Sequence, residues 1–133
     1  MRVFVDCDNV SLRVADSIID HIAVKEGAMP SEMFLVGKES KKWKRWANNW
    51  RKKLGKGNVE YRPISSPKRN EADEILATRL ETSVAREVAV GDLSSTVFAV
   101  ISSDNDFGPV VTRCRNGGAY VVGGNAAFPP VFY

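Results

Sequence analysis

Residues 97–111 read VFAVISSDNDFGPVV, in which five apolar residues lead directly into a polar stretch with two aspartates. A short, wholly apolar run of this kind is typical of a strand that is covered on both faces. A second such run opens the chain, where MRVFVDCDNV (residues 1–10) carries a strand over residues 2–5 into Asp6 and Asp8. Two buried strands that both end in acids predict a parallel sheet with a polar site at its carboxyl edge.

Helical patterns alternate with strands along the rest of the chain. Ser11 can cap a helix that Gly27 closes, and Ser40 precedes a second helix that ends at Gly55. Further helical segments are expected over residues 71–88 and 106–115, further strands over residues 33–36, 59–62 and 119–122, and a loop over residues 63–70. The predicted fold is α/β: a single three-layer αβα domain around a central, mostly parallel sheet of about five strands.

The length and composition fit one domain without covalent cross-links. With 133 residues, of which 44% are hydrophobic, the chain can bury one core. We expect the domain to span residues 1–124, with a tail or loop over residues 125–133. Cys7 and Cys114 are too few and too far apart for a disulfide framework and are expected to be reduced thiols. No apolar run reaches membrane length and the start has no signal-peptide organisation, so a cytoplasmic protein with no membrane partner is expected.

The positive charge is concentrated in one segment. Residues 38–69 contain twelve of the nineteen basic residues and only two acids, which makes this segment +10 and the remainder −7 within a net charge of +3. Such a separation suits a polyanionic ligand such as nucleic acid, although a solvated lysine-rich helix face gives the same pattern. The phosphate-binding candidates are the basic residues of the second helix: Lys41, Lys42, Lys44, Arg45, Arg51, Lys52 and Lys53.

Acidic residues follow both buried strands. If the strands are neighbours, Asp6, Asp8, Asp104 and Asp106 converge in one crevice, and their mutual repulsion is most simply relieved by a bound cation. Asp73, in the first turn of the third helix, can face the same crevice. Ligand sets made only of oxygen atoms suit Mg²⁺ or Mn²⁺. The chain has a single histidine, so it lacks the histidine pair of a metal-free ribonuclease, which leaves metal-assisted hydrolysis as the predicted chemistry.

Three motifs together resemble the NYN domain, a member of the PIN-like nuclease superfamily. VFVDCDNVS resembles its opening signature, KRNEADEILATRL its middle motif, and VFAVISSDNDFGPVV its Ser-x-Asp-x-Asp-Phe-x-Pro motif, in the family's order. GGAYVVGG is similar to the turn and strand that follow. The resemblance implies a metal-dependent nuclease, with single-stranded RNA as the common substrate and Mg²⁺ or Mn²⁺ as cofactor.

The resemblance also assigns roles to individual positions. It places the catalytic and metal-binding acids at Asp6, Asp73, Asp104 and Asp106, with Asp8 as a helper in the metal site. Asn9 and Ser103 are then orienting groups. Cys7 stands where the family usually has glycine, which crowds the turn after the first strand.

Other functions remain open on the sequence alone. Asp6-x-Asp8 after an apolar strand also opens the haloacid dehalogenase phosphatases, although their fold needs a longer chain. A non-catalytic RNA-binding module with a relic metal site is the second alternative. A homodimer, a further domain or a paired antitoxin protein are compatible with the sequence, as are endonuclease and exonuclease action.

Overall fold

The computed structural model describes residues 1–65, 71–103, 107–125 and 131–132. One sheet with strand order β3-β2-β1-β4-β5-β6 forms its centre. The strands are β1 (Arg2–Asp6), β2 (Glu32–Lys38), β3 (Val59–Ile64), β4 (Val97–Ile101), β5 (Tyr120–Asn125) and β6 (Val131–Phe132). The pairs among the first five strands are parallel, and β6 is antiparallel to β5. β1 and β4 are therefore adjacent, as the predicted site requires.

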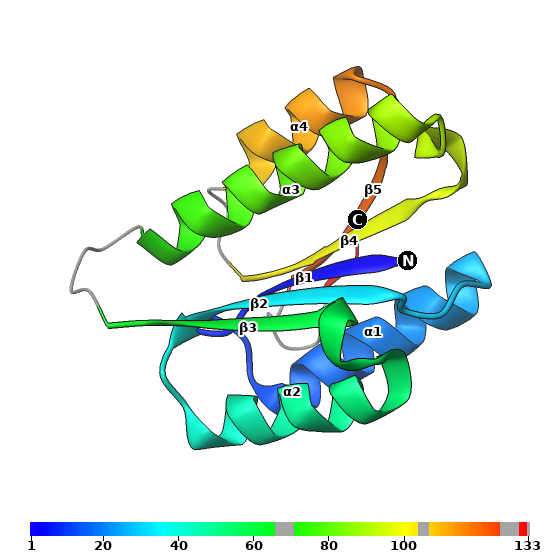
Figure 1. Ribbon diagram of the computed structural model, residues 1–133. Helices are drawn as coiled ribbons and strands as arrows, with labels where there is room; N and C mark the ends of the chain where they lie inside the picture. Colours follow the sequence, from blue (N-terminus) through cyan, green and yellow to red (C-terminus); the bar gives the residue numbers. More distant parts are fainter. Residues whose placement is uncertain (66–70, 104–106, 126–130, 133) are drawn as a thin grey trace.

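Helices cover both faces of this sheet (Figure 1). On one side lie α1 (Leu12–Glu26) and α2 (Lys41–Leu54), and on the other α3 (Glu71–Val90) and α4 (Gly108–Asn116), with short 3₁₀ turns at Lys56–Asn58 and Leu93–Ser95. Each face of the sheet has its own hydrophobic cluster, because alternate residues of a strand point to opposite sides. The three-layer α/β prediction is confirmed.

The helix ends follow from the residues that the sequence provides. Ser11 accepts a hydrogen bond from the Val14 amide at 3.2 Å, and Ser40 accepts one from the Trp43 amide at 3.3 Å, so both serines are N-caps. Gly27 ends α1 with φ 61°, a left-handed conformation that favours glycine.

Two segments predicted as loops take part in the sheet instead. The loop prediction over residues 63–70 is wrong at its start, since β3 continues through Pro63 to Ile64. Proline is tolerated there because β3 is an edge strand, which hydrogen-bonds to a neighbour on one side only. At the other end β5 runs on to Asn125, and Val131–Phe132 pair with it as β6.

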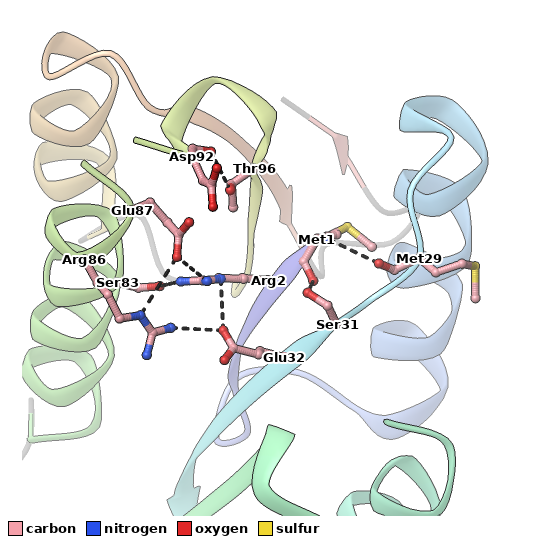
Figure 2. A network of polar contacts seen from close by, with 10 residues as sticks. All are labelled: Met1, Arg2, Met29, Ser31, Glu32, Ser83, Arg86, Glu87, Asp92 and Thr96. Atoms are coloured by element: carbon pink, nitrogen blue, oxygen red, sulfur yellow. Dashed lines mark hydrogen bonds and ion pairs between the residues drawn. The ribbon is translucent and has the colours of Figure 1, made fainter. Parts of the chain in front are cut away.

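A polar network ties the C-terminal half of α3 to the amino edge of the sheet (Figure 2). Arg2, at the start of β1, forms ion pairs with buried Glu87 and with Glu32, and donates a hydrogen bond to Ser83 at 3.1 Å. Arg86 adds an exposed pair with Glu32 at 3.0 Å. The network fixes α3 at the end of the sheet that lies away from the predicted acids.

Removing the buried acid of this network should cost much more stability than removing its exposed arginine. Glu87→Ala leaves the largely covered Arg2 guanidinium without its buried partner, which should lower the free energy of unfolding by about 2 kcal/mol. Arg86→Ala removes an exposed pair with Glu32 and a long contact of 3.9 Å to Glu87, and should cost less than about 1 kcal/mol. Urea unfolding of both variants measures the difference. Equal losses would show that Glu87 contributes no more than a surface charge.

Among the described residues, no helix combines the length and the apolar character that crossing a membrane requires.

Candidate active site

Asp6 is a buried carboxylate at the carboxyl end of β1. Its exposed fraction is 0%, and it lies two residues after Phe4 and opposite Val36 of β2, so it faces the α3 and α4 side of the sheet as they do. Its Oδ2 accepts hydrogen bonds from Asn9 Nδ2 at 2.6 Å and from Ser102 Oγ at 2.8 Å. These two bonds fix the plane of the carboxylate, and among the described residues its Oδ1 has one long contact, to the Asp8 amide at 3.3 Å.

The surroundings of Asp6 penalise its charge. Burial raises the pKa of Asp6 above its ordinary value of 3.8, and the hydrogen bonds from Asn9 and Ser102 oppose that rise. Among the described residues, the groups that donate hydrogen bonds to Asp6 are all neutral. A cation beside the carboxylate would offset the free-energy cost of burying its charge. A buried carboxylate that binds a metal ion bears this cost as long as the metal is absent.

The end of β4 supplies the second part of the site. Val5 pairs with Ile101 in register, so Ser102 is the residue beside Asp6. Ser103, predicted as an orienting group, donates instead to the backbone oxygen of Asn9 at 2.7 Å. Ser102 is thus the serine that holds the carboxylate, and the sequence analysis missed it because only the register between β1 and β4 reveals the contact. Asn9 contacts Asp6 directly, in the geometry expected of an orienting group.

Two of the predicted acids, Asp104 and Asp106, lie outside the described residues. Asp73, another predicted acid, is half-buried in the first turn of α3. This helix begins at the edge of the sheet where β1 and β4 end (Figure 1). Within the described ranges no three acids, histidines or cysteines lie together as a complete metal site. The structure therefore brings together Asp6, Asn9 and Ser102, and places Asp73 at their edge of the sheet.

Glu71 adds a carboxylate that the sequence analysis did not single out. It opens α3, and its Oε2 atom is buried without a hydrogen-bond partner among the described residues. A buried oxygen of this kind is costly unless a donor or a cation satisfies it. The carboxylate oxygens of Asp6 and this unsatisfied oxygen of Glu71 are hard ligands of the kind that Mg²⁺ and Mn²⁺ prefer. The residues at this edge therefore fit either ion.

Asp8 and Cys7 have surroundings different from those of Asp6. Asp8 is exposed, and its Oδ1 accepts a hydrogen bond from the Lys38 amide at 2.7 Å. Cys7 points into the hydrophobic cluster on the α1 and α2 side, where burial and the nearby charges of Asp6 and Asp8 raise the pKa of its thiol well above the usual range. A buried thiol of that kind is not a nucleophile at neutral pH.

The basic residues of α2 divide into two groups. The helix starts at the carboxyl edge of the sheet and runs back toward the amino edge (Figure 1), so Lys41 and Lys42 lie nearest to the acids. Lys52 is ten residues after Lys42, about 15 Å farther along the axis. The exposed members at the first turns are Lys41, Lys42, Lys44 and Arg45. At the same edge exposed Lys38 ends β2, and exposed Arg62 lies two residues before the end of β3.

The second group consists of Arg51, Lys52 and Lys53 in the last turn of α2, and two of these residues already make structural contacts. Arg51 donates to the Val59 carbonyl at 3.2 Å and to Asn48 at 2.7 Å, and the Lys53 ammonium lies 4.8 Å from the centre of the Trp50 ring. Trp43 and Trp46 are buried against the sheet and Trp50 is half-buried, as their helical spacing predicts. The better candidates for phosphate binding are therefore the basic residues in the first turns of α2.

A cleft of about 180 Å³ lies at the opposite edge of the sheet, between α3 and the first residues of β1, β2 and β3. Its three arginines, Arg2, Arg79 and Arg86, are each paired with a glutamate. Glu32 pairs with both Arg2 and Arg86, and Glu87 provides Arg2 with a second partner, so all three arginines are engaged in ion pairs. The cleft contains none of the predicted site residues. The carboxyl edge remains the candidate active site.

Comparison with known proteins identifies the domain. The family model of the NYN domain matches residues 1–132, essentially the whole chain. Neither the curated proteins nor the solved structures gave a match. The family match favours a nuclease over a haloacid dehalogenase phosphatase. The chain therefore belongs to the NYN domain family of PIN-like nucleases.

Proposed function

We propose that this protein is a metal-dependent ribonuclease that hydrolyses phosphodiester bonds of single-stranded RNA at the carboxyl edge of its sheet. The observation that carries the proposal is Asp6: a carboxylate buried at the end of a central strand, oriented by neutral donors, in a chain of a nuclease family. A carboxylate with that burial and orientation suits a cation better than it suits a turn or a helix cap.

The proposed metal-binding residues are Asp6, Asp104 and Asp106, with Asp73 completing the shell or holding a water molecule. When bound, Mg²⁺ or Mn²⁺ lowers the pKa of an attacking water and offsets charge on the departing oxygen. Ser102 and Asn9 hold the Asp6 carboxylate in one plane so that Oδ1 is the oxygen left for a ligand. The basic side chains at the start of α2 bind backbone phosphates, which positions the strand without reading its sequence.

Digestion of end-labelled single-stranded RNA and DNA tests the proposal. We expect cleavage of RNA in Mn²⁺ or Mg²⁺, and none after a chelator is added. Internal fragments would identify an endonuclease and stepwise shortening an exonuclease. Binding of RNA without cleavage in Mn²⁺ would favour the non-catalytic module, and phosphate release from small phosphate esters with intact RNA would favour the phosphatase.

The two ends of α2 should contribute unequally to RNA binding. Lys41→Glu with Lys42→Glu reverses two charges beside the acids, and should lower RNA affinity about tenfold while reducing the salt slope by roughly 0.7 for each lost phosphate contact. Lys52→Glu with Lys53→Glu changes the net charge equally but at the far end of the helix, so we expect an affinity within about threefold of the parent.

Fluorescence anisotropy of labelled RNA across a salt series measures both quantities. Equal losses in the two double variants would mean that only net charge matters. A stronger loss in the Lys52 and Lys53 variant would place the RNA along the whole helix or at its far end.

A further inference from the structure

Asp8 connects the two functional parts of the carboxyl edge. Its Oδ1 atom accepts the backbone N–H of Lys38 at 2.7 Å, and its own amide contacts Asp6 Oδ1 at 3.3 Å. One residue therefore links the turn that carries the buried carboxylate with the end of β2, thirty residues later in the chain.

The segment that Asp8 holds leads directly into the basic helix. Lys38 is the last residue of β2, and Ser40, two residues on, is the N-cap of α2. Tyr61 supports the same segment from β3, since its hydroxyl accepts the Ser40 amide at 2.9 Å and donates to the Lys38 carbonyl at 3.4 Å. The position of Lys38 therefore determines where Lys41 and Lys42 start.

The two chain segments are packed too closely for any residue but glycine at position 37. A Cβ atom added to Gly37 would lie 2.8 Å from Cys7 Cβ and 2.9 Å from Asp8 Oδ1, closer than such atoms approach in real structures. The Cys7 amide also donates to the Val36 carbonyl at 2.9 Å. The junction between the Asp6 turn and the end of β2 is thus built at contact distance.

We propose that Asp8 is a positioning residue that keeps the phosphate-binding start of α2 in register with Asp6, and that it does not bind the metal. This inference rests on the proposed ribonuclease function. Its basis is the 2.7 Å bond, which engages one carboxylate oxygen with backbone, and the exposure of the side chain, which contrasts with the complete burial of Asp6. Positioning needs only an acceptor oxygen at this place, whereas a carboxylate that binds the metal also contributes its negative charge to the affinity for the cation.

Two substitutions separate these requirements. Asp8→Asn retains an oxygen that can accept the Lys38 N–H but loses the charge, and Asp8→Ala loses both. We expect Asp8→Asn to keep KM and kcat for RNA within about twofold of the parent, and Asp8→Ala to raise KM about tenfold, the loss typical of one strong hydrogen bond, with kcat little changed. The Mn²⁺ concentration for half-maximal activity should be the same in both variants and the parent. Hydrogen exchange of the Lys38 amide should accelerate only in Asp8→Ala.

Specific results would overturn the inference. A weaker response of Asp8→Asn to Mn²⁺ would show that Asp8 is a metal ligand, and this variant decides the question even if Asp8→Ala fails to fold. An unchanged KM in folded Asp8→Ala would show that the junction does not position the RNA. Failure of the parent protein itself to cleave RNA would refute the proposed function, and this outcome is distinct from a difference between variants.

Discussion

Replacing Asp6 with asparagine is expected to lower kcat for RNA cleavage by at least about a thousandfold, because roughly 4 kcal/mol of transition-state stabilisation would be lost with the charge. The protein should remain folded. An asparagine oxygen in the place of Oδ2 can still accept from both Asn9 and Ser102, and the new NH₂ group then takes the place of Oδ1. Single-turnover cleavage of labelled RNA measures the loss.

Asp92→Asn is the matched control. It makes the same chemical change at the amino edge of the sheet, where Asp92 lies after the end of α3 (Figure 2), and should leave the rate unchanged. If purified Asp6→Asn cleaves RNA as fast as the parent does, the carboxyl-edge acids are not the active site.

Mn²⁺ should stabilise the parent protein and have little effect on Asp6→Asn. A metal that binds only the folded state adds RT ln(1 + [L]/Kd) to the free energy of unfolding, or about 4 kcal/mol at a thousandfold excess over Kd. Without Asp6 the site loses its buried ligand, and the gain should fall to a small fraction of that value. Thermal unfolding across a Mn²⁺ titration gives both numbers, and a parent melting curve that ignores millimolar-range Mn²⁺ would mean that these acids share no metal.

Without metal, near neutral pH, the parent protein should be less stable than Asp6→Asn. Because burial raises the pKa of Asp6 in the folded state, the folded protein holds this proton more tightly than the unfolded chain does. The resulting contribution to stability is present below the unfolded pKa and is lost as pH rises through the folded pKa. At neutral pH Asp6→Asn should therefore be more stable than the metal-free parent, and this advantage should shrink as pH falls through the folded pKa and be gone below about pH 4. Activity and metal-free stability make opposing demands on residue 6.

The sequence predicted those features that depend on local pattern. The apolar runs of β1 and β4, the serine caps at Ser11 and Ser40 and the glycine that closes α1 all depend on neighbouring residues, so each was readable without the fold. β3 was expected to stop before Pro63, because the two prolines and two serines of residues 63–70 are typical of a loop. Its continuation depends on β3 lying at the edge of the sheet, which no single segment reveals.

The details of the site depend on contacts between distant segments. Ser102 rather than Ser103 reaches Asp6 because β1 and β4 pair in one particular register. The bond between Asp8 and the Lys38 amide requires the close approach that Gly37 permits. The unequal contributions to RNA binding that we propose for the basic residues of α2 follow from the direction of this helix relative to the sheet, whereas the sequence presents these residues as one run of charge.

The crowding of aromatic rings on α2 has an optical consequence. All three tryptophans of the chain lie on this helix, with ring centres 5.1 Å apart for Trp43 and Trp46 and 6.0 Å apart for Trp46 and Trp50. Excitation energy passes readily between rings at such separations, so the three should emit as a single unit whose most solvent-accessible member is Trp50. The tryptophan fluorescence of the protein consequently originates from α2 alone, and a polyanion that binds to this helix should change that fluorescence without any attached dye.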